Sequence, residues 1–283
     1  MTIYPTIPDA PRAIQKGVPL KHLLGQPAIE CLAENILTVT DDFDRTGFVS
    51  LAMAGIEALT LMQRAKHIAQ ALHDHMPVKY SQAVKILVAS FTPAKTQADE
   101  FGLAEMFYLI HSSFIAEYGV DAKYNAGKDP FEVSMEALYE LTKRATSEFA
   151  IRAFLINDQR RTLAYIEPWL EDDDPHVRRL CSEGSRPRLP WGIRLKALVL
   201  DPQPVISILE KLKDDESLYV RRSVANHMGD IAKDHPELIF AMCDKWLQAG
   251  ASVQLKWVIR HALRNPAKKA NPQALALRAL AKV

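Results

Sequence analysis

The sequence has little glycine, and it lacks the motifs that build the common cofactor sites. Glycine occurs 11 times in 283 residues. There is no G-x-G-x-x-G followed by an acidic residue, no G-x-x-x-x-G-K-[S/T], no H-E-x-x-H and no G-x-S-x-G. The nine histidines are scattered, and no Cys/His spacing predicts zinc. We therefore expect no cofactor and no metal, so any chemistry must rest on carboxylates, arginines and aromatic rings.

Cysteine and long apolar runs are also scarce. Cys31, Cys181 and Cys243 are far apart and odd in number, which argues against a disulfide framework and favours a reduced, cytoplasmic setting. No run approaches the roughly 18 apolar residues of a membrane span, so we expect no membrane partner. Residues 1–19 contain prolines and no apolar block of the secretory type, and they predict an irregular N-terminal arm.

Helical periodicity runs through most of the chain. Between Phe48 and His73, apolar residues recur at spacings of three and four with no proline, as in an amphipathic helix. No segment alternates apolar and polar residues long enough to predict a strand. The 17 prolines lie mainly between the periodic segments, where helices begin and end. These patterns predict an all-α fold.

The C-terminal half contains an internal repeat. The tripeptide Val177-Arg178-Arg179 recurs as Val220-Arg221-Arg222, an offset of 43, and a weaker copy begins at Ile259, an offset of 39. Such periods are typical of HEAT and armadillo arrays, in which stacked helix pairs form a curved superhelix. We therefore predict a right-handed superhelical α-solenoid of HEAT-like helix pairs with a basic concave face. It would be one domain over residues 20–283, with its clearest repeats at 146–270.

The charge is unevenly distributed along the chain. Residues 1–140 hold 11 Lys+Arg against 17 Asp+Glu, whereas residues 141–283 hold 24 against 17. A basic segment of this kind is the usual electrostatic signature of nucleic-acid binding. Stacked repeats would align their arginines in a basic ladder; alternatively, each arginine pairs with the acidic cluster of the adjacent repeat, or the charges are merely solvated helix faces. The arginines concerned are Arg178, Arg179, Arg221, Arg222, Arg260 and Arg264.

The stretch Ser182–Trp191, SEGSRPRLPW, predicts a stiff basic loop after a helix. Its prolines restrict the backbone and would present Arg186 and Arg188 at low entropic cost to phosphate oxygens. Trp191 either stacks on a base or is a core residue between repeats. Glu183 is either an ion-pair partner of this loop or a carboxylate kept for chemistry.

A second candidate stretch is TSEFAIRAF, residues 146–154. Ser147 and Glu148 suit a helix N-cap and first turn, which would be a sufficient structural reason for both. Arg152 follows Glu148 by four residues, a spacing that brings two side chains onto one helix face. If that face lines a groove, Glu148 is a candidate for stabilising a cation.

Three segments together resemble a known family. TSEFAIRAF, HVRRLCSEGSRPRLPWGIRL and SLYVRRSVANHMGDIAKDHPE are similar to the AlkC branch of the bacterial HEAT-like DNA alkylation-repair glycosylases, the relatives of AlkD. The resemblance is strongest over about residues 130–245. Ala153 stands where the family motif leads us to expect proline, and the N-terminal arm is longer than expected. Some members carry a C-terminal immunoglobulin-like domain, for which a chain ending at Val283 has no room, so we expect the shorter type.

The resemblance implies excision of cationic N3-alkylated bases, 3-methyladenine and possibly 3-methylcytosine, from duplex DNA in base-excision repair. A cationic base is already a good leaving group, so the protein needs mainly a carboxylate that stabilises the oxocarbenium-like sugar. Most glycosylases flip the target base into a pocket, whereas this family is expected to act without one. A bacterial, cytoplasmic monomer that associates with the nucleoid through alkylated double-stranded DNA is the corresponding expectation.

The resemblance also assigns roles to residues of this chain. Glu148 is the first choice for the catalytic carboxylate, Glu183 the second and Glu117 a distant third. Two other classes of function stay open: a non-catalytic DNA-binding scaffold of the same fold, and an adaptor whose arginines bind an acidic protein. The predicted DNA contacts are Arg152, Arg178, Arg179, Arg186, Arg188, Trp191, Arg221, Arg222, Asn226 and His227.

Overall fold

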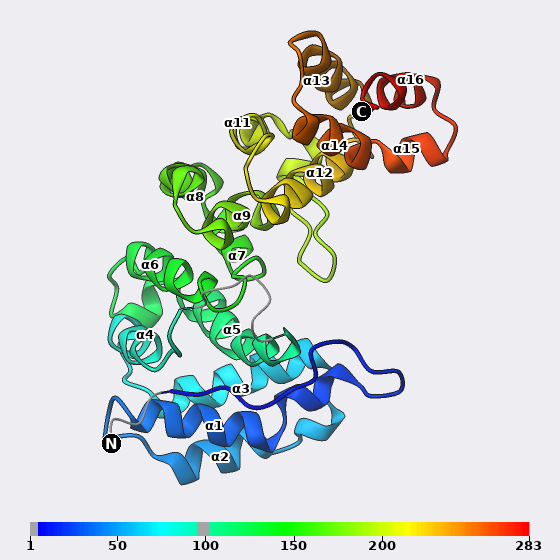
Figure 1. Cartoon of the computed structure of the whole chain (residues 1–283). Helices are drawn as coiled ribbons and strands as arrows, with labels where there is room; N and C mark the ends of the chain where they lie inside the picture. The colour runs from blue at the N-terminus through cyan, green and yellow to red at the C-terminus, as the bar shows by residue number, and fades with distance from the viewer. Residues whose placement is uncertain (1–4, 95–101, 283) are drawn as a thin grey trace. The chain divides into compact units, whose positions relative to one another are not determined.

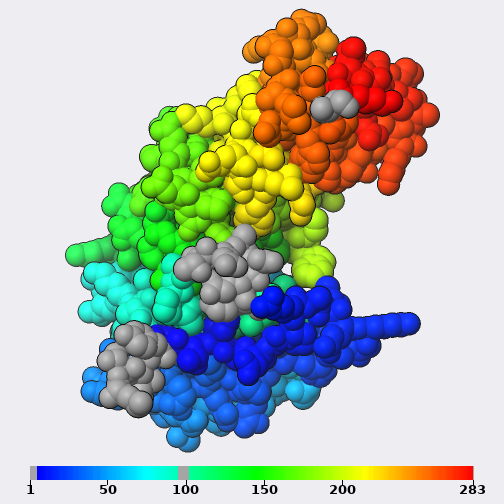
Figure 2. Space-filling model, viewed as in Figure 1, coloured from blue at the N-terminus to red at the C-terminus, as the bar shows by residue number. Residues whose placement is uncertain are grey.

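Every regular element in the described part of the chain is a helix. The computed structural model describes residues 5–94 and 102–282, and within these ranges it contains α-helices and short 3-10 helices but no strand. This confirms the all-α prediction. The contacts divide the chain into two compact units, Met1–Phe154 and Leu155–Val283, which we call unit 1 and unit 2 (Figures 1 and 2). The superhelical handedness, the concave face and the single domain over 20–283 stay predictions.

Unit 1 packs its helices around an apolar core. Helix α3 contacts both α2 and α5, α1 packs on α2, and α4 packs on α6. Side chains such as Leu32, Phe48 and Phe114 are fully buried between these helices. The helices are η1 (Leu20–Leu24), α1 (Gln26–Leu37), α2 (Arg45–Met53), η2 (Ile56–Ala58), α3 (Leu61–His75), α4 (Tyr80–Ala89), η3 (Gly102–Tyr108), α5 (Leu109–Tyr118), η4 (Ala122–Asn125) and α6 (Phe131–Thr142).

The N-terminal arm is irregular backbone that is attached to unit 1 at two points. The buried Asn35 side chain of α1 accepts a hydrogen bond from the Thr6 N–H (2.9 Å) and donates one to the Thr6 carbonyl (2.7 Å). Further along, the Leu103 N–H donates to the carbonyl of Pro11 at 3.2 Å. The arm therefore has a defined path over α1 and η3.

Unit 2 repeats a helix-on-helix arrangement. Helix α12 lies between α9 and α14, so these three form one row, while α11 packs on α9 and α12. Helix α13 contacts α12 and α16. The helices are α7 (Ile151–Asn157, which spans the boundary of the units), α8 (Gln159–Ile166), η5 (Pro168–Glu171), α9 (Pro175–Gly184), α10 (Lys196–Leu200), α11 (Gln203–Leu212), α12 (Leu218–Ile231), α13 (Pro236–Gln248), α14 (Val253–Ala262), α15 (Arg264–Lys268) and α16 (Pro272–Leu280).

The repeat of 43 residues has the same local structure in both of its copies. Val177 in α9 and Val220 in α12 are each the third residue of their helix, and both are fully buried. Before each helix an aspartate, Asp172 or Asp215, accepts a hydrogen bond from the N–H two residues later at 2.8 Å. The same aspartate at this spacing therefore forms the same hydrogen bond before both helices, although only α9 also has a side-chain N-cap, from Asp174.

The arginine after each valine binds back to the same helix start. Arg178 donates from Nη1 to the carbonyls of Asp172 (2.8 Å) and Asp173 (3.0 Å). In the next copy Arg221 donates from Nη1 to the carbonyls of Asp215 and Glu216, the equivalent positions. The first arginine of each pair thus stabilises the turn that precedes its helix.

The predicted third copy of the repeat is wrong in its register. Ile259 is the seventh residue of α14 rather than the third, so the match in sequence does not correspond to a match in structure. Arg260 donates from Nη1 to the carbonyl of Ala281, and not to the start of its own helix. The short match Ile-Arg is compatible with any turn of an amphipathic helix, which is why the sequence alone misplaced it.

Candidate functional site

The first candidate carboxylate, Glu148, lies in a turn before α7. The spacing had predicted that Glu148 and Arg152 lie one turn apart on a single helix. This prediction is wrong, because the helix begins at Ile151. The Glu148 side chain is 9% exposed, and its Oε2 accepts a hydrogen bond from the Thr146 hydroxyl at 2.9 Å. The expected N-cap role of Ser147 is wrong, because α7 begins only at Ile151; the Ser147 hydroxyl donates instead to the carbonyl of Leu138 at 2.9 Å.

Arg152 is part of the core of the structure. Its side chain is 0% exposed, among the largest fully buried side chains. Arg152 is therefore not a surface side chain. A direct contact of Arg152 with a phosphate would require this region to open first.

The second candidate carboxylate, Glu183, belongs to a buried ionic cluster between α9 and α12. Its Oε1 lies 2.6 Å from Arg186 Nη1 and 3.5 Å from Arg179 Nη2. Arg186 also binds Asp230 of α12: its Nε and its Nη2 each lie 2.8 Å from Asp230 Oδ2. Two arginines therefore neutralise the charge of Glu183, and Arg186 links the two helices.

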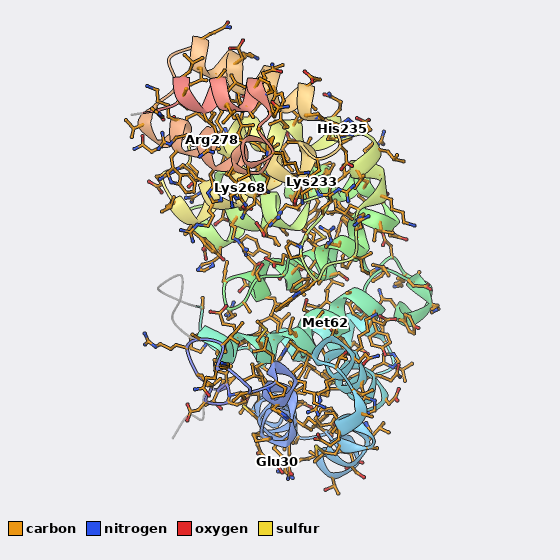
Figure 3. All side chains as sticks on the ribbon, turned by 90° about the vertical axis from the view of Figure 1, so that its right-hand side faces the viewer. Glu30, Met62, Lys233, His235, Lys268 and Arg278 are labelled. Atoms are coloured by element: carbon orange, nitrogen blue, oxygen red, sulfur yellow. The ribbon has the colours of Figure 1, made fainter. Side chains whose placement is uncertain are left out.

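The cluster extends to the surface at one end of α12. Asp230 Oδ1 accepts a hydrogen bond from Lys233 Nζ at 3.0 Å, and this lysine side chain is half exposed. Figure 3 labels Lys233 and the nearby His235, whose ring contacts the carbonyl of Val199 through Nε2 at 2.8 Å. Acidic and basic side chains thus alternate from the buried Glu183, through Arg186 and Asp230, to the half-exposed Lys233.

The second loop arginine, Arg188, forms a separate two-point pair. Its Nε and Nη2 each lie 2.7 Å from the carboxylate oxygens of Asp234. The hydrogen bond from Arg188 lowers the pKa of Asp234, and the same bond raises the pKa of Arg188. The pair ties the loop after α9 to the turn after α12.

Arg178 follows the alternative that pairs each arginine with the acidic cluster of the adjacent repeat, whereas Arg221 binds backbone carbonyls of its own helix start. Arg178 binds both carboxylate oxygens of Asp215 in the adjacent copy, and this bond is the main cause that raises the pKa of the arginine. Arg179 lies over the ring of Tyr219 at 4.8 Å, in cation–π contact. These three side chains therefore do not form a continuous ladder of free arginines.

Positive charge is nevertheless present along the row of α12 and α14. Arg222 is exposed, and the described residues give its guanidinium no ion-pair partner. Asn226, one turn further, accepts hydrogen bonds at Oδ1 from Arg264 Nη2 (2.9 Å) and contacts His261 Nε2 (3.3 Å). The pKa of His261 is lowered mainly by burial, and the positive charges of Arg264 and Arg222 lower it further.

The remaining predicted contacts differ in exposure. His227 is fully buried in α12, whereas Trp191 is 67% exposed. The alternative that made Trp191 a core residue between repeats is therefore wrong. Sequence reasoning missed Asp230 and Asp234 as partners of the loop arginines. Their spacing of four residues matched no motif, and a partner 44 or 46 residues away leaves no local signal.

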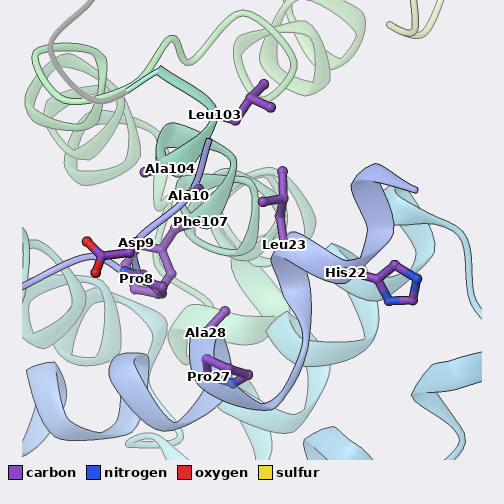
Figure 4. Close-up of a pocket in the computed structure, with 10 residues that line it drawn as sticks. All are labelled: Pro8, Asp9, Ala10, His22, Leu23, Pro27, Ala28, Leu103, Ala104 and Phe107. Atoms are coloured by element: carbon purple, nitrogen blue, oxygen red, sulfur yellow. The ribbon is translucent and has the colours of Figure 1, made fainter. Parts of the chain in front are cut away.

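One cavity of about 100 Å³ lies in unit 1, between the N-terminal arm, η1, α1 and η3 (Figure 4). It is mostly apolar, and none of the candidate carboxylates lines it. In residues 5–94 and 102–282 there is no group of three or more His, Cys, Asp or Glu side chains arranged to hold a metal ion. Within the same residues no helix is long and apolar enough to cross a membrane.

Comparison with known proteins places the chain in a family. No protein-family model matches it. It is 39% identical to the uncharacterized protein YhaZ of Bacillus subtilis (strain 168) over 260 residues, which are 91% of this chain and 67% of that protein. It is also 39% identical to the alkylpurine DNA glycosylase AlkC of Pseudomonas fluorescens, bound to DNA containing an abasic site analog, with a TM-score of 0.78 over 92% of this chain and 67% of that one. The resemblance seen in the sequence motifs is thereby confirmed, and the chain belongs to the AlkC family.

Proposed function

We propose that this protein is a DNA glycosylase that releases cationic N3-alkylated bases, 3-methyladenine and possibly 3-methylcytosine, from duplex DNA. The observation that carries the proposal is the likeness over nine-tenths of the chain to a DNA-bound alkylpurine DNA glycosylase. The charge surplus after residue 140 and the exposed Arg222 beside Asn226 support a DNA ligand. The alkylated base is already positively charged, so it leaves as a neutral molecule and does not need to be protonated by a general acid.

We assign the carboxylate that stabilises the developing sugar cation to Glu148. Glu183 is the weaker candidate because it belongs to the Glu183–Arg186–Asp230 link that joins α9 to α12, which gives its side chain a structural role of its own. Glu117 is exposed on α5 and lies 3.5 Å from Lys66, in a screened surface pair. Of the three, Glu148 combines low exposure with a fixed position in the turn before α7.

The predicted DNA contacts divide into three groups by their exposure and their bonds. Arg222 and Trp191 are exposed, and the half-buried Arg179 of α9 and Asn226 of α12 lie on neighbouring helices of one row. We propose that this group meets the DNA directly. The second group holds the helix starts and the loop through carboxylates and carbonyls; it contains Arg178, Arg186, Arg188 and Arg221. Arg152 and His227 are buried and are proposed to act through packing.

The experiment is base release from a methylated duplex, with the free bases identified by chromatography. Glu148→Gln removes the negative charge with little change in shape, and we expect release to fall about 100-fold or more while duplex binding is kept. Glu183→Gln should reduce release only as far as it destabilises the fold. Glu136→Gln, an exposed change on α6, is the matched control and should behave as wild type.

Each outcome separates one class of function. Full release by Glu148→Gln would refute the assigned carboxylate. Tight binding of methylated duplex with no free base would show a non-catalytic DNA-binding member of the fold. A binding constant that barely changes with salt would instead favour an adaptor for an acidic protein, since phosphate contacts give a log–log slope of about −0.9 per contact.

A further inference from the structure

The loop between α9 and α10 ends in a tight turn with an unusual residue at its third position. The Gly192 N–H donates to the carbonyl of Leu189 at 3.2 Å, which closes a four-residue turn with Pro190 second and Trp191 third. Trp191 has φ +62°. Proline followed by a positive φ is the signature of a type II turn, in which the third position normally belongs to glycine or asparagine.

Tryptophan at this position is strained without any gain in burial. A bulky side chain rarely adopts a positive φ, and such strain persists mainly where function requires it. The Trp191 side chain is 67% exposed, so its packing does not offset the strain. Glycine follows only one residue later, at 192, where the turn does not need it. The fold therefore holds a large aromatic ring out into solvent against the preference of the backbone.

The base of the loop is rigid. Arg188 is bound at two points to Asp234, and the Leu195 N–H donates to the carbonyl of Pro187 at 3.2 Å. Leu189 and Leu195 are buried beneath the tip. In Figures 1 and 2 this yellow-green loop projects from the helices of unit 2. A firmly attached loop can push its tip into a ligand without folding back.

The tip combines apolar and basic side chains. Ile193 is 64% exposed beside Trp191, and the exposed Arg194 and Lys196 follow immediately. Proteins that kink duplex DNA insert apolar side chains between base pairs, while nearby cations hold the phosphates. The chemistry of the tip matches that arrangement.

We infer that Trp191 and Ile193 form an apolar wedge that enters double-stranded DNA at a base step and kinks the duplex there. The inference rests on the proposed function only in taking duplex DNA as the ligand. Unstacking is least costly at a damaged or abasic site, so the wedge would also favour weakened positions. A kink made in this way opens the backbone at the lesion and needs no pocket for the base.

The wedge is tested with duplexes that carry 2-aminopurine beside an abasic site analog, because this base brightens when it is unstacked. Wild type should raise the 2-aminopurine fluorescence, and Trp191→Gly should abolish the rise and weaken binding about tenfold. Glycine adopts φ +62° without strain, so this variant should melt at or above the wild-type temperature. Misfolding would then be excluded as the cause of the lost fluorescence and the weaker binding. Trp191→Phe should restore part of the signal.

Leu200→Ala removes another large apolar side chain, 79% exposed in the same unit, and should leave the fluorescence rise unchanged. An undiminished rise and affinity in Trp191→Gly would overturn the wedge, as would the absence of any rise with wild type. Sedimentation of wild type but not of Trp191→Gly with anionic lipid vesicles, with no response to duplex, would overturn it in favour of a membrane ligand. Base release measured in parallel keeps the two proposals apart: release without unstacking refutes the wedge alone, and unstacking without release refutes the glycosylase alone.

Discussion

Arg178 of α9 and Asp215 before α12 form a two-point ion pair between successive copies of the repeat. Nε lies 2.7 Å from Oδ2 and Nη2 lies 3.0 Å from Oδ1, and the two side chains are 9% and 6% exposed. Asp215 also shapes the start of α12, because its Oδ1 accepts the Ser217 N–H at 2.8 Å. One aspartate thus serves both the beginning of its own helix and the junction with the preceding repeat.

Removing either partner of this pair should destabilise unit 2. Arg178→Ala leaves the buried Asp215 carboxylate unpaired, and we expect the free energy of unfolding to fall by about 3 kcal/mol, as for other buried pairs that lose one partner. Urea denaturation measures the change. Arg188→Ala breaks the more exposed pair with Asp234 and should cost about 1 kcal/mol or less. Equal losses in the two variants would contradict the structural role assigned to Arg178.

Arg222 should affect DNA binding and leave stability alone. Its side chain is exposed on α12, so Arg222→Ala should shift the unfolding free energy by less than about 0.5 kcal/mol. If it neutralises one phosphate, the variant should reduce the steepness of the log–log salt dependence of duplex binding by about 0.9. Lys211→Ala on α11, a pair partner of Glu171, is the control and should keep the wild-type slope. An unchanged slope for Arg222→Ala would remove it from the interface.

His111 should make the stability of unit 1 depend on pH. The imidazole is fully buried among Phe91, Phe107 and Tyr108, and burial lowers its pKa from 6.5 to about 3. Between these values the unfolded chain binds the proton and the folded chain does not. Stability is therefore complete above about pH 6.5 and is lost as the pH falls, by at most about 1.4 kcal/mol per unit.

The His111→Phe variant supplies the comparison for this pH effect. It cannot take up a proton, so the urea midpoint should fall less between pH 7 and pH 5 than in wild type. Other acid-sensitive groups are common to both proteins and cancel in the difference. The same pH dependence in wild type and variant would mean that His111 accepts its proton in the folded state.

The attachment of the N-terminal arm should control the reactivity of Cys31. This half-buried thiol donates to the Thr6 carbonyl at 3.3 Å, and burial is the main cause that raises its pKa. Asn35→Ala removes the two hydrogen bonds that hold Thr6, worth about 1 kcal/mol each, so labelling of Cys31 by a thiol reagent should accelerate about tenfold or more. Gln26→Ala on the same helix is the control.

The other two thiols provide an internal reference for that labelling. Cys181 and Cys243 are buried, and burial raises the pKa of both, to about 12 for Cys243. Native protein should therefore react at one thiol, with the remaining two released only by denaturant. Equal rates for wild type and Asn35→Ala would show that the arm does not shield Cys31.

The local features of this protein follow from its sequence. Periodic apolar residues produced the helices, and the offset of 43 residues produced two copies with the same buried valine and the same arginine contacts. The motifs around Glu148, Glu183 and Trp191 sufficed to identify the AlkC family. Such features depend on residues within one or two turns of each other, and that information is written along the chain.

The tertiary structure alone decided which charges are available. The partners of Arg178, Arg186 and Arg188 lie 37, 44 and 46 residues away, before, within and after α12, the next helix of the row. It also placed Glu148 outside α7 and turned Trp191 outward at a positive φ. An arginine is equally compatible with a carboxylate or a phosphate, and only the stacking of α9 on α12 brings the carboxylates within reach.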